Sequence, residues 1–179
     1  MRKVLSLALA FVLVVAAAPA AFAANTTTLT TTVPPATYTL NIPADQTIAY
    51  GSGTVEIGNV TVTESTGFAY GKNLAVTVTY DAFKSDAVST TIPFKLSQSG
   101  STSSGVKKTD LASGDQLVFR YKTDGAVSEK ASILVAGASS YYYSIDSISL
   151  SVVGDAWGKA LAGEYTGTIT FTAEVVVEP

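Results

Sequence analysis

Few side chains in this sequence have the chemistry for catalysis, and the clearest pattern among them is Ser104 followed three residues later by Lys107. In a Ser-x-x-Lys pair the lysine can accept the proton of a serine nucleophile. This pair lies in a Ser/Gly-rich stretch and lacks the other sequence elements of such enzymes. The 14 Asp and Glu residues fall mostly at turns and on exposed strand positions, which disfavours a two-carboxylate glycosidase. We therefore expect a protein that is not an enzyme.

Side chains that bind metals are equally scarce. The sequence has no histidine and no cysteine, which excludes Ser-His-Asp triads, zinc sites built on either residue, disulfides and thiol catalysis. Two pairs of acids, Asp81 with Asp86 and Asp110 with Asp115, carry oxygen ligands suited to calcium. Their spacing is looser than that of a dedicated calcium loop, so we expect turn capping and solvation. A weak calcium site is the alternative, and no cofactor is implied.

Aromatic residues offer binding chemistry, since the chain has 9 tyrosines and 1 tryptophan. In the run Tyr141-Tyr142-Tyr143, alternation along a strand directs Tyr142 away from its two neighbours and toward solvent. There its ring could stack on a sugar or on a partner protein. Tyr70 and Trp157 are the other candidates for a ligand-binding surface. The alternative is that these rings only stabilise cross-strand pairs.

The elements that would position these residues are β-strands. From Glu164 to Val177 apolar side chains alternate with threonines, and a period of two indicates a strand with one buried and one exposed face. Phe171 lies in the middle of the apolar phase, so we expect it at the centre of the core and Thr170 at the surface. Similar stretches recur from Ala36 onward, about eight in all, with polar turns between them. The pattern predicts an all-β fold, an antiparallel β-sandwich.

Local signals refine this arrangement. Asp124-Gly125 between two alternating runs predicts a β-hairpin. The apolar phase slips by one residue near Gly58-Asn59 and again near Asp146-Ser147, and each slip predicts a β-bulge. Pro93 on an exposed phase predicts an edge strand, because proline cannot donate a hydrogen bond to a central ladder.

Two stretches depart from the strand pattern. The composition of Ser97 to Gly105 predicts a flexible loop. In the stretch from Asp155 to Ala162, Trp157 and Leu161 are four residues apart and Gly163 follows. This spacing predicts one helical turn that plugs the end of the sandwich.

The amino terminus has the three parts of a secretory signal peptide. Arg2 and Lys3 precede an apolar run from Val4 to Ala18 and the small-residue site Ala21-Phe22-Ala23. We expect cleavage after Ala23, which leaves no membrane span in the mature chain. The expected organisation is 1–23 signal peptide, 24–35 flexible tether rich in threonine and proline, and 36–179 a single β-sandwich domain.

Charge narrows the range of partners. The formal net charge is −3, and it becomes more negative when Arg2 and Lys3 are removed. An acidic chain without a basic patch disfavours nucleic acid and anionic lipid as partners. The segment 25–33 leaves two alternatives, a loose tail on a monomer or, because Leu29, Thr31 and Val33 share one phase, self-association by pairing with a neighbouring subunit. The sequence favours the monomer.

Two stretches resemble known proteins. Trp157 to Val175, with its Gly-x-Tyr-Thr start, resembles the closing strand of bacterial surface and pilin-type immunoglobulin-like domains. Ala36 to Ile48 resembles the opening strand of secreted surface domains of Gram-positive bacteria. The chain lacks the cysteine pair of chaperone-assembled pilins and has no Trp-x-Leu sequence, so the resemblance is to the general class. It implies an immunoglobulin-like β-sandwich.

The expected function follows from export, composition and this resemblance. We expect a non-catalytic structural or adhesion-type protein, secreted or held at the cell surface, with a cell-surface glycan or protein as partner. The alternative is a carbohydrate-binding module that uses the exposed aromatics Tyr142, Tyr70 and Trp157.

Overall fold

The computed structural model describes residues 30–32, 34–102, 105–134 and 142–177. The chain divides into two compact units, Met1–Val33 and Pro34–Pro179, and the strands found among the described residues belong to the second. The expected signal peptide, 1–23, lies outside the described residues. So does most of the expected tether, whose described residues 30–32 and 34–35 are exposed and have no regular secondary structure.

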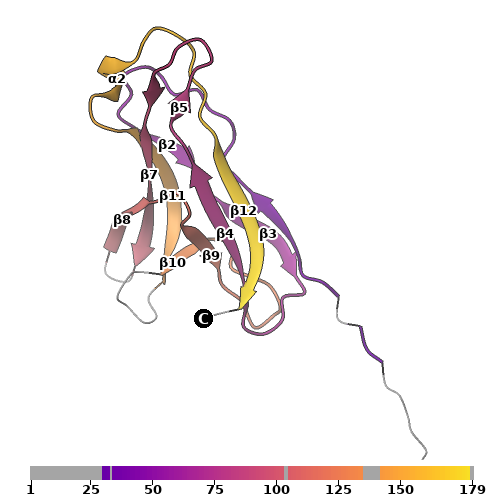
Figure 1. Ribbon diagram of the computed structural model, residues 1–179. Helices are drawn as coiled ribbons and strands as arrows, with labels where there is room; N and C mark the ends of the chain where they lie inside the picture. Colours follow the sequence, from indigo (N-terminus) through magenta and orange to yellow (C-terminus); the bar gives the residue numbers. More distant parts are fainter. Residues whose placement is uncertain (1–29, 33, 103–104, 135–141, 178–179) are drawn as a thin grey trace, which may run out of the picture. The chain divides into compact units, whose positions relative to one another are not determined.

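The described residues form an all-β, antiparallel structure, as predicted, with more and shorter strands than expected (Figure 1). The first six strands are β1 (Thr37–Asn41), β2 (Thr54–Gly58), β3 (Thr61–Thr66), β4 (Lys72–Tyr80), β5 (Phe83–Lys84) and β6 (Thr91–Ile92). The others are β7 (Phe94–Thr102), β8 (Gly105–Leu111), β9 (Gln116–Phe119), β10 (Ser132–Leu134), β11 (Tyr142–Val152) and β12 (Ile169–Val177). A short helix, α2 (Ala156–Lys159), precedes β12. No helix in the described part of the chain is long and apolar enough to cross a membrane.

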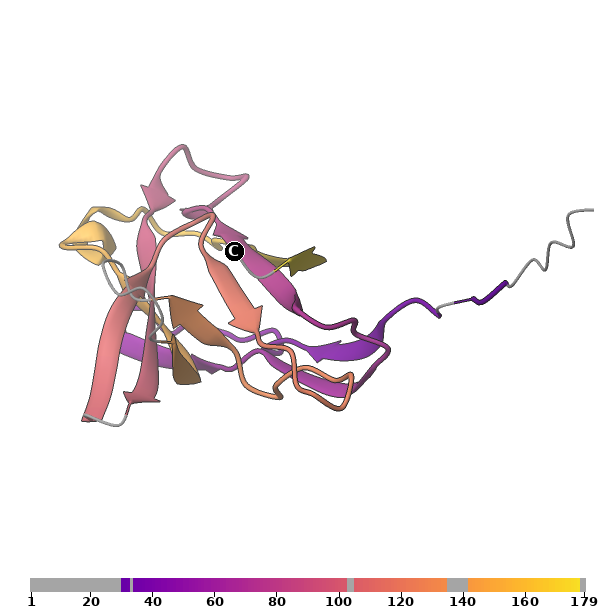
Figure 2. The same cartoon turned by 90° about the horizontal axis from the view of Figure 1, so that it is seen from below.

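Most strands belong to one large sheet in the order β12-β4-β9-β10-β11-β7-β8. The long strand β11 changes partner along one edge: its first part pairs with β10 up to Ser144, and its later part pairs with β2 from Ile148 onward. The sheet therefore divides at β11, and Figure 2 shows the strands curving around the interior. Two further ribbons pair β1 with β3 and β5 with β6.

Apolar side chains from all these strands share one core. The innermost strand is β4, which lies between β12 and β9 and buries four consecutive residues, 73–76. Its one buried polar side chain, Asn73, is satisfied because Oδ1 accepts a hydrogen bond from the Tyr121 backbone N–H at 2.8 Å. The largest fully buried apolar side chains are Phe119, Leu74, Leu96, Leu111, Leu117, Ile145 and Ile148. Their burial is the main favourable term in folding.

Two local predictions are confirmed, and a third is confirmed in part. Asp124-Gly125 turns the chain between β9 and β10, which pair antiparallel, and Gly125 adopts the positive φ of 81° that glycine permits. The register of β11 against β7 shifts between Ile145 and Ser147, where a bulge was expected. The helical turn exists as α2, but it ends at Lys159 and leaves Leu161 53% exposed, so Leu161 does not plug the core.

Two others are wrong, and one is confirmed in part. The Ser/Gly-rich stretch forms most of β7, because backbone pairing with β11 on one side and β8 on the other outweighs its weak strand preference. Pro93 marks no edge strand: it precedes β7, which from Leu96 is paired on both sides. At Gly58-Asn59 the register of β2 against β11 shifts, with Gly58 opposite Ile148 and Glu56 opposite Ser149, as the expected bulge requires, but the chain then passes to a separate strand, β3, whose partner is β1.

Phe171 faces the core but is only half-buried, so its expected place at the core's centre is also wrong. The reason is the position of its strand. β12 is the last strand of the sheet, and an edge strand has a neighbour on one side only.

Candidate functional site

Trp157 is the predicted binding residue that the structure places in a groove. Its ring on α2 lies edge-to-face with that of Tyr50, with ring centroids 5.4 Å apart and planes at 64°. Trp157 Nε1 donates a hydrogen bond to the Ser52 carbonyl oxygen at 3.1 Å, and the Tyr50 hydroxyl donates one to the Trp157 carbonyl oxygen at 3.3 Å. These contacts fix α2 against the turn before β2.

The two rings line a groove with a volume of about 930 Å³, here called the aromatic groove. Asp45 and Glu164 contribute carboxylates to its lining, and Tyr165 contributes a third ring. Tyr50 is 76% exposed, so a ligand in the groove can reach it. An exposed ring beside carboxylates can pack against the apolar face of a sugar while the carboxylates accept hydrogen bonds from its hydroxyls.

The other two predicted aromatics do not line this groove. Tyr70 lies in the turn before β4, is 88% exposed, and packs edge-to-face on Tyr121 at 5.7 Å between centroids. Tyr142 begins β11, where its backbone pairs with Leu134, and its side chain lies outside the described part of the structure. The structure therefore brings Trp157 together with Tyr50, a residue not predicted from the sequence, and places Tyr70 on a separate surface.

Of the four acids proposed as calcium ligands, Asp81 pairs with a lysine and Asp115 caps a turn. Lys84 hydrogen-bonds Asp81 and holds the pKa of that carboxyl below its usual value. Asp115 accepts a hydrogen bond from the Ala112 backbone N–H at 2.8 Å. Near the aromatic groove, the hydrogen bond from Lys159 lowers the pKa of Asp155 in the same way. Within the described residues, no group of three potential ligands is placed to hold a metal ion.

The Ser104 and Lys107 pair falls largely outside the described residues. Ser104 is not described, and of Lys107 only the backbone in β8 is described, paired with Gly100 of β7. The prediction that this pair is not catalytic stays a prediction.

A second candidate surface follows the free edge of β12, which pairs with β4 alone among the described strands. Leu74 of β4 is fully buried, yet its partner on the same face of β12, Val175, is 47% exposed. Val78 is fully buried, and its partner Phe171 is only half-buried. Val177, two residues beyond Val175, is 65% exposed. Core-facing side chains are therefore more exposed to solvent on β12 than on β4.

The first strand shows the same loss of cover. Among described residues β1 pairs only with β3, where Val62 is 1% exposed and its partner Leu40 is half-buried. Tyr38 is also half-buried, with its ring 6.2 Å from that of Phe68. Ile42, which follows β1, is 54% exposed. Both terminal strands thus leave apolar side chains uncovered.

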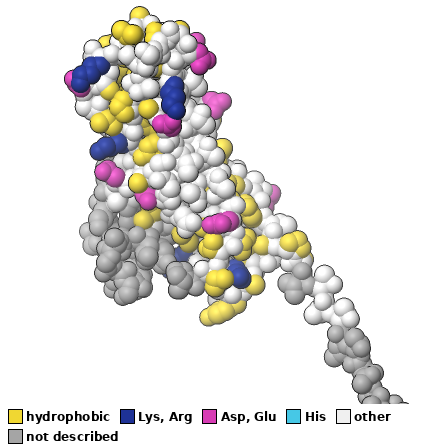
Figure 3. All heavy atoms as spheres, in the orientation of Figure 1, with side chains coloured by type: hydrophobic (Ala, Val, Ile, Leu, Met, Phe, Trp, Pro, Cys, Tyr) yellow, Lys and Arg dark blue, Asp and Glu magenta, His cyan; other side chains and the backbone are white. Residues whose placement is uncertain are grey.

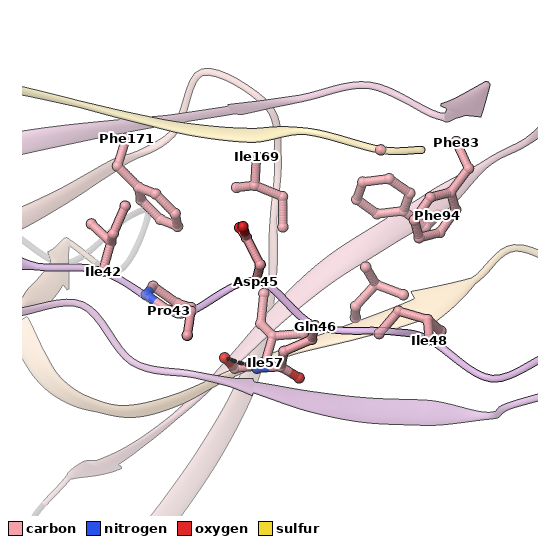
Figure 4. Close-up of a pocket in the computed structure, with 13 residues that line it drawn as sticks. Ile42, Pro43, Asp45, Gln46, Ile48, Ile57, Phe83, Phe94, Ile169 and Phe171 are labelled. Carbon is pink, nitrogen blue, oxygen red and sulfur yellow. Dashed lines mark hydrogen bonds between the residues drawn. The ribbon is translucent and has the colours of Figure 1, made fainter. Parts of the chain in front are cut away.

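A cavity of about 170 Å³ lies between the segment that follows β1 and the first part of β12. Ile42 and Pro43 line it from the segment after β1, and Ile169 and Phe171 line it from β12 (Figure 4). We name the free edges of β1 and β12, together with this cavity, the β1–β12 seam. Apolar side chains reach the surface along the lower part of β12 in Figure 3.

Aromatic packing and one side-chain hydrogen bond shape the cavity. Phe83 and Phe94 also line it, and their rings lie 4.8 Å apart between centroids. Gln46 fixes the segment after β1, because its Nε2 donates to the Ile57 carbonyl oxygen at 2.7 Å (Figure 4). The cavity therefore has well-packed walls and lies beside β12, whose outer edge is unpaired among the described strands.

No protein-family model, curated protein or solved structure matches this chain. Neither the aromatic groove nor the β1–β12 seam was predicted in full from the sequence. Tyr50 stands beside the Gly51-Ser52-Gly53 turn, and an aromatic residue at a turn was a usable signal of exposure. The seam had no local signal, because it depends on which strands lie at the edges.

Proposed function

We propose that this protein is an exported, non-catalytic structural or adhesion-type protein that acts outside the cell through protein contacts made at the β1–β12 seam. The observation that supports this proposal is the apolar surface left open at two unpaired edges, with Val175 and Val177 exposed on β12 and Ile42 exposed after β1. Proteins without a partner usually protect such edges with proline, charge or a covering segment. β1 contains no charged residue and no proline, and β12 contains one charge, Glu174.

Export is part of this proposal and rests on the sequence of residues 1–23. The basic start, apolar run and Ala21-Phe22-Ala23 site are those of a cleaved signal peptide. The immunoglobulin-like sandwich belongs to the proposal too. Antiparallel pairing and a core shared between facing strands support it.

Expression of the full chain in a secreting bacterial host tests this function. We expect protein outside the cytoplasm with the intact mass of residues 24–179, and association with itself or with envelope proteins measured by light scattering and pull-down. Val175→Lys should reduce this association because it places a charge on the apolar edge, whereas Thr172→Lys, on the exposed face of β12, should not. A protein that stays in the cytoplasm with residues 1–23 still attached would contradict the proposal, as would equal effects of the two substitutions on association.

A carbohydrate-binding module is the second candidate, and the aromatic groove favours it. The test is a glycan-array screen followed by titration of any sugar that binds. Carbohydrate recognition at this groove predicts saturable binding that Tyr50→Ala removes and Tyr70→Ala leaves intact, since both rings are exposed but only Tyr50 lines the groove. Absence of saturable binding to any sugar would rule out this candidate and leave the protein-contact function.

A further inference from the structure

We propose that the β1–β12 seam binds residues 25–33 of a second copy of this chain, which enter it as an added β-strand. The inference rests on the proposed function and names the partner at the same surface. An edge strand exposes unpaired N–H and C=O groups that can hydrogen-bond to an extended segment. Here β1 and β12 each have one such edge, and the cavity lies between β12 and the segment after β1, so an inserted segment could pair with β12 or with β1.

The length of the segment suits the site. β12 has 9 residues, and 25–33 is a stretch of the same length. At about 3.3 Å per residue each spans roughly 30 Å when extended. Threonine and valine are good strand formers, and the segment carries no charge that insertion would have to desolvate.

The outer face of the seam is made of threonine pairs. In β1 and β3, Thr37 stands opposite Thr66 and Thr39 opposite Thr63. On the other side of the seam β12 and β4 repeat the pattern, with Thr170 opposite Thr79 and Thr172 opposite Thr77.

The segment 25–33 can continue both rows. Its four outward positions are all threonine: Thr26, Thr28, Thr30 and Thr32. Threonines directly opposite each other on adjacent strands are a favourable cross-strand pair. An inserted segment would therefore extend the same solvent face across the seam.

The inner phase of the segment faces the uncovered core. Leu29 and Val33 fall on this phase, and their side chains would lie beside the half-buried and exposed apolar residues of β12. Insertion would cover Val175 and fill part of the cavity beside Phe171. The gain is the removal of apolar surface from water on both partners.

Pro34-Pro35 favours a second copy as the source of the strand. These prolines stand between the segment and β1, and consecutive prolines hold the backbone extended rather than allowing a tight reversal. A segment that leaves its own β1 in an extended form is suited to reach a neighbouring molecule.

Disulfide trapping in the exported full chain tests this assignment, since the chain has no cysteine of its own. Chains carrying Leu29→Cys are mixed with ¹⁵N-labelled chains carrying Ala173→Cys, Val175→Cys or Val177→Cys, three core-face positions that cover the registers of the added strand. Intact mass then separates mixed dimers from like dimers. Thr30→Cys is the matched control, because it lies on the opposite face of the same segment.

We expect mixed dimers from Leu29→Cys with one of the three β12 variants, and several-fold fewer from Thr30→Cys. Equal trapping of the two cysteines, or no mixed dimer with any β12 variant, overturns the assignment. If the protein still associates and Val175→Lys still weakens that association, the seam keeps its function and only residues 25–33 are excluded. If the exported protein shows no association at all, the proposed function fails with it.

Discussion

At the scale of single residues, exposure separates side chains that look equivalent in the sequence. Phe119 and Phe171 both occupy the middle of an alternating apolar run, yet Phe119 is 0% exposed on β9 and Phe171 is half-buried on β12. Tyr50 and Tyr70 are both exposed, but only Tyr50 lies against Trp157. The neighbours that the fold supplies determine what each ring can do.

This difference predicts unequal costs of truncation. Phe119→Ala should lower the free energy of unfolding by about 3–5 kcal/mol, because it removes buried surface and leaves a cavity. Phe171→Ala should cost about half as much, since solvent already reaches part of its ring. Urea melts of both variants measure the free energies, with Thr170→Ala as an exposed control expected to change stability by less than about 1 kcal/mol. Equal losses for the two phenylalanines would show that β12 is covered like an interior strand.

At the scale of elements, pairing partners override local composition. The Ser/Gly-rich sequence of β7 is held by β11 on one side and β8 on the other. The hydroxyls of Ser99 and Ser147 lie 2.7 Å apart across β7 and β11 and form a hydrogen bond. The small element β5 joins the segment before β12 through two backbone hydrogen bonds between Lys84 and Thr166, at 2.8 and 2.9 Å.

That junction predicts a position where a methyl group is not tolerated. A Cβ built on Gly167 would lie 2.6 Å from the Phe83 ring, so Gly167→Ala forces the ring out of its place beside Phe94. We expect a loss of about 1–3 kcal/mol in the free energy of unfolding, measured by urea melts.

Gly158→Ala is the matched control for this substitution. Gly158 lies in α2 with no atom within 4 Å of a built Cβ, and alanine there should stabilise the protein by up to about 1 kcal/mol. A neutral Gly167→Ala would mean that Phe83 is not packed against the start of β12.

At the scale of the whole molecule, packing is tight around β4 and open at the seam. β4 has paired strands on both sides and four consecutive buried residues, whereas β1 and β12 each have one paired side among described strands. Stability is not uniform in such a structure, because strands with fewer buried contacts open at lower free energy. We expect the β1–β12 seam to open at the lowest free energy. A partner bound there would add the most stability.

Amide hydrogen exchange measures this gradient. In dilute protein we expect slow exchange for β4 and β9 and faster exchange for β1 and for the last residues of β12. Raising the protein concentration should slow exchange in β1 and β12 selectively if a second copy covers the seam, with β9 as the internal reference. Protection of β12 equal to that of β4 at every concentration would show that the edge is already closed.

The all-β character, the antiparallel pairing and the Asp124-Gly125 turn followed from the sequence, because alternation and turn chemistry act between neighbouring residues. The bulge near Asp146 followed as well, since a slip of phase is also local. Tertiary structure alone decided that β7 is interior and β12 is an edge, that Tyr50 meets Trp157, and that the first and last strands leave a seam. Strand order is set by contacts between residues far apart in the chain. Alternation with a period of two predicts on which face of a strand each side chain lies, but it does not predict which strands are neighbours in the sheet.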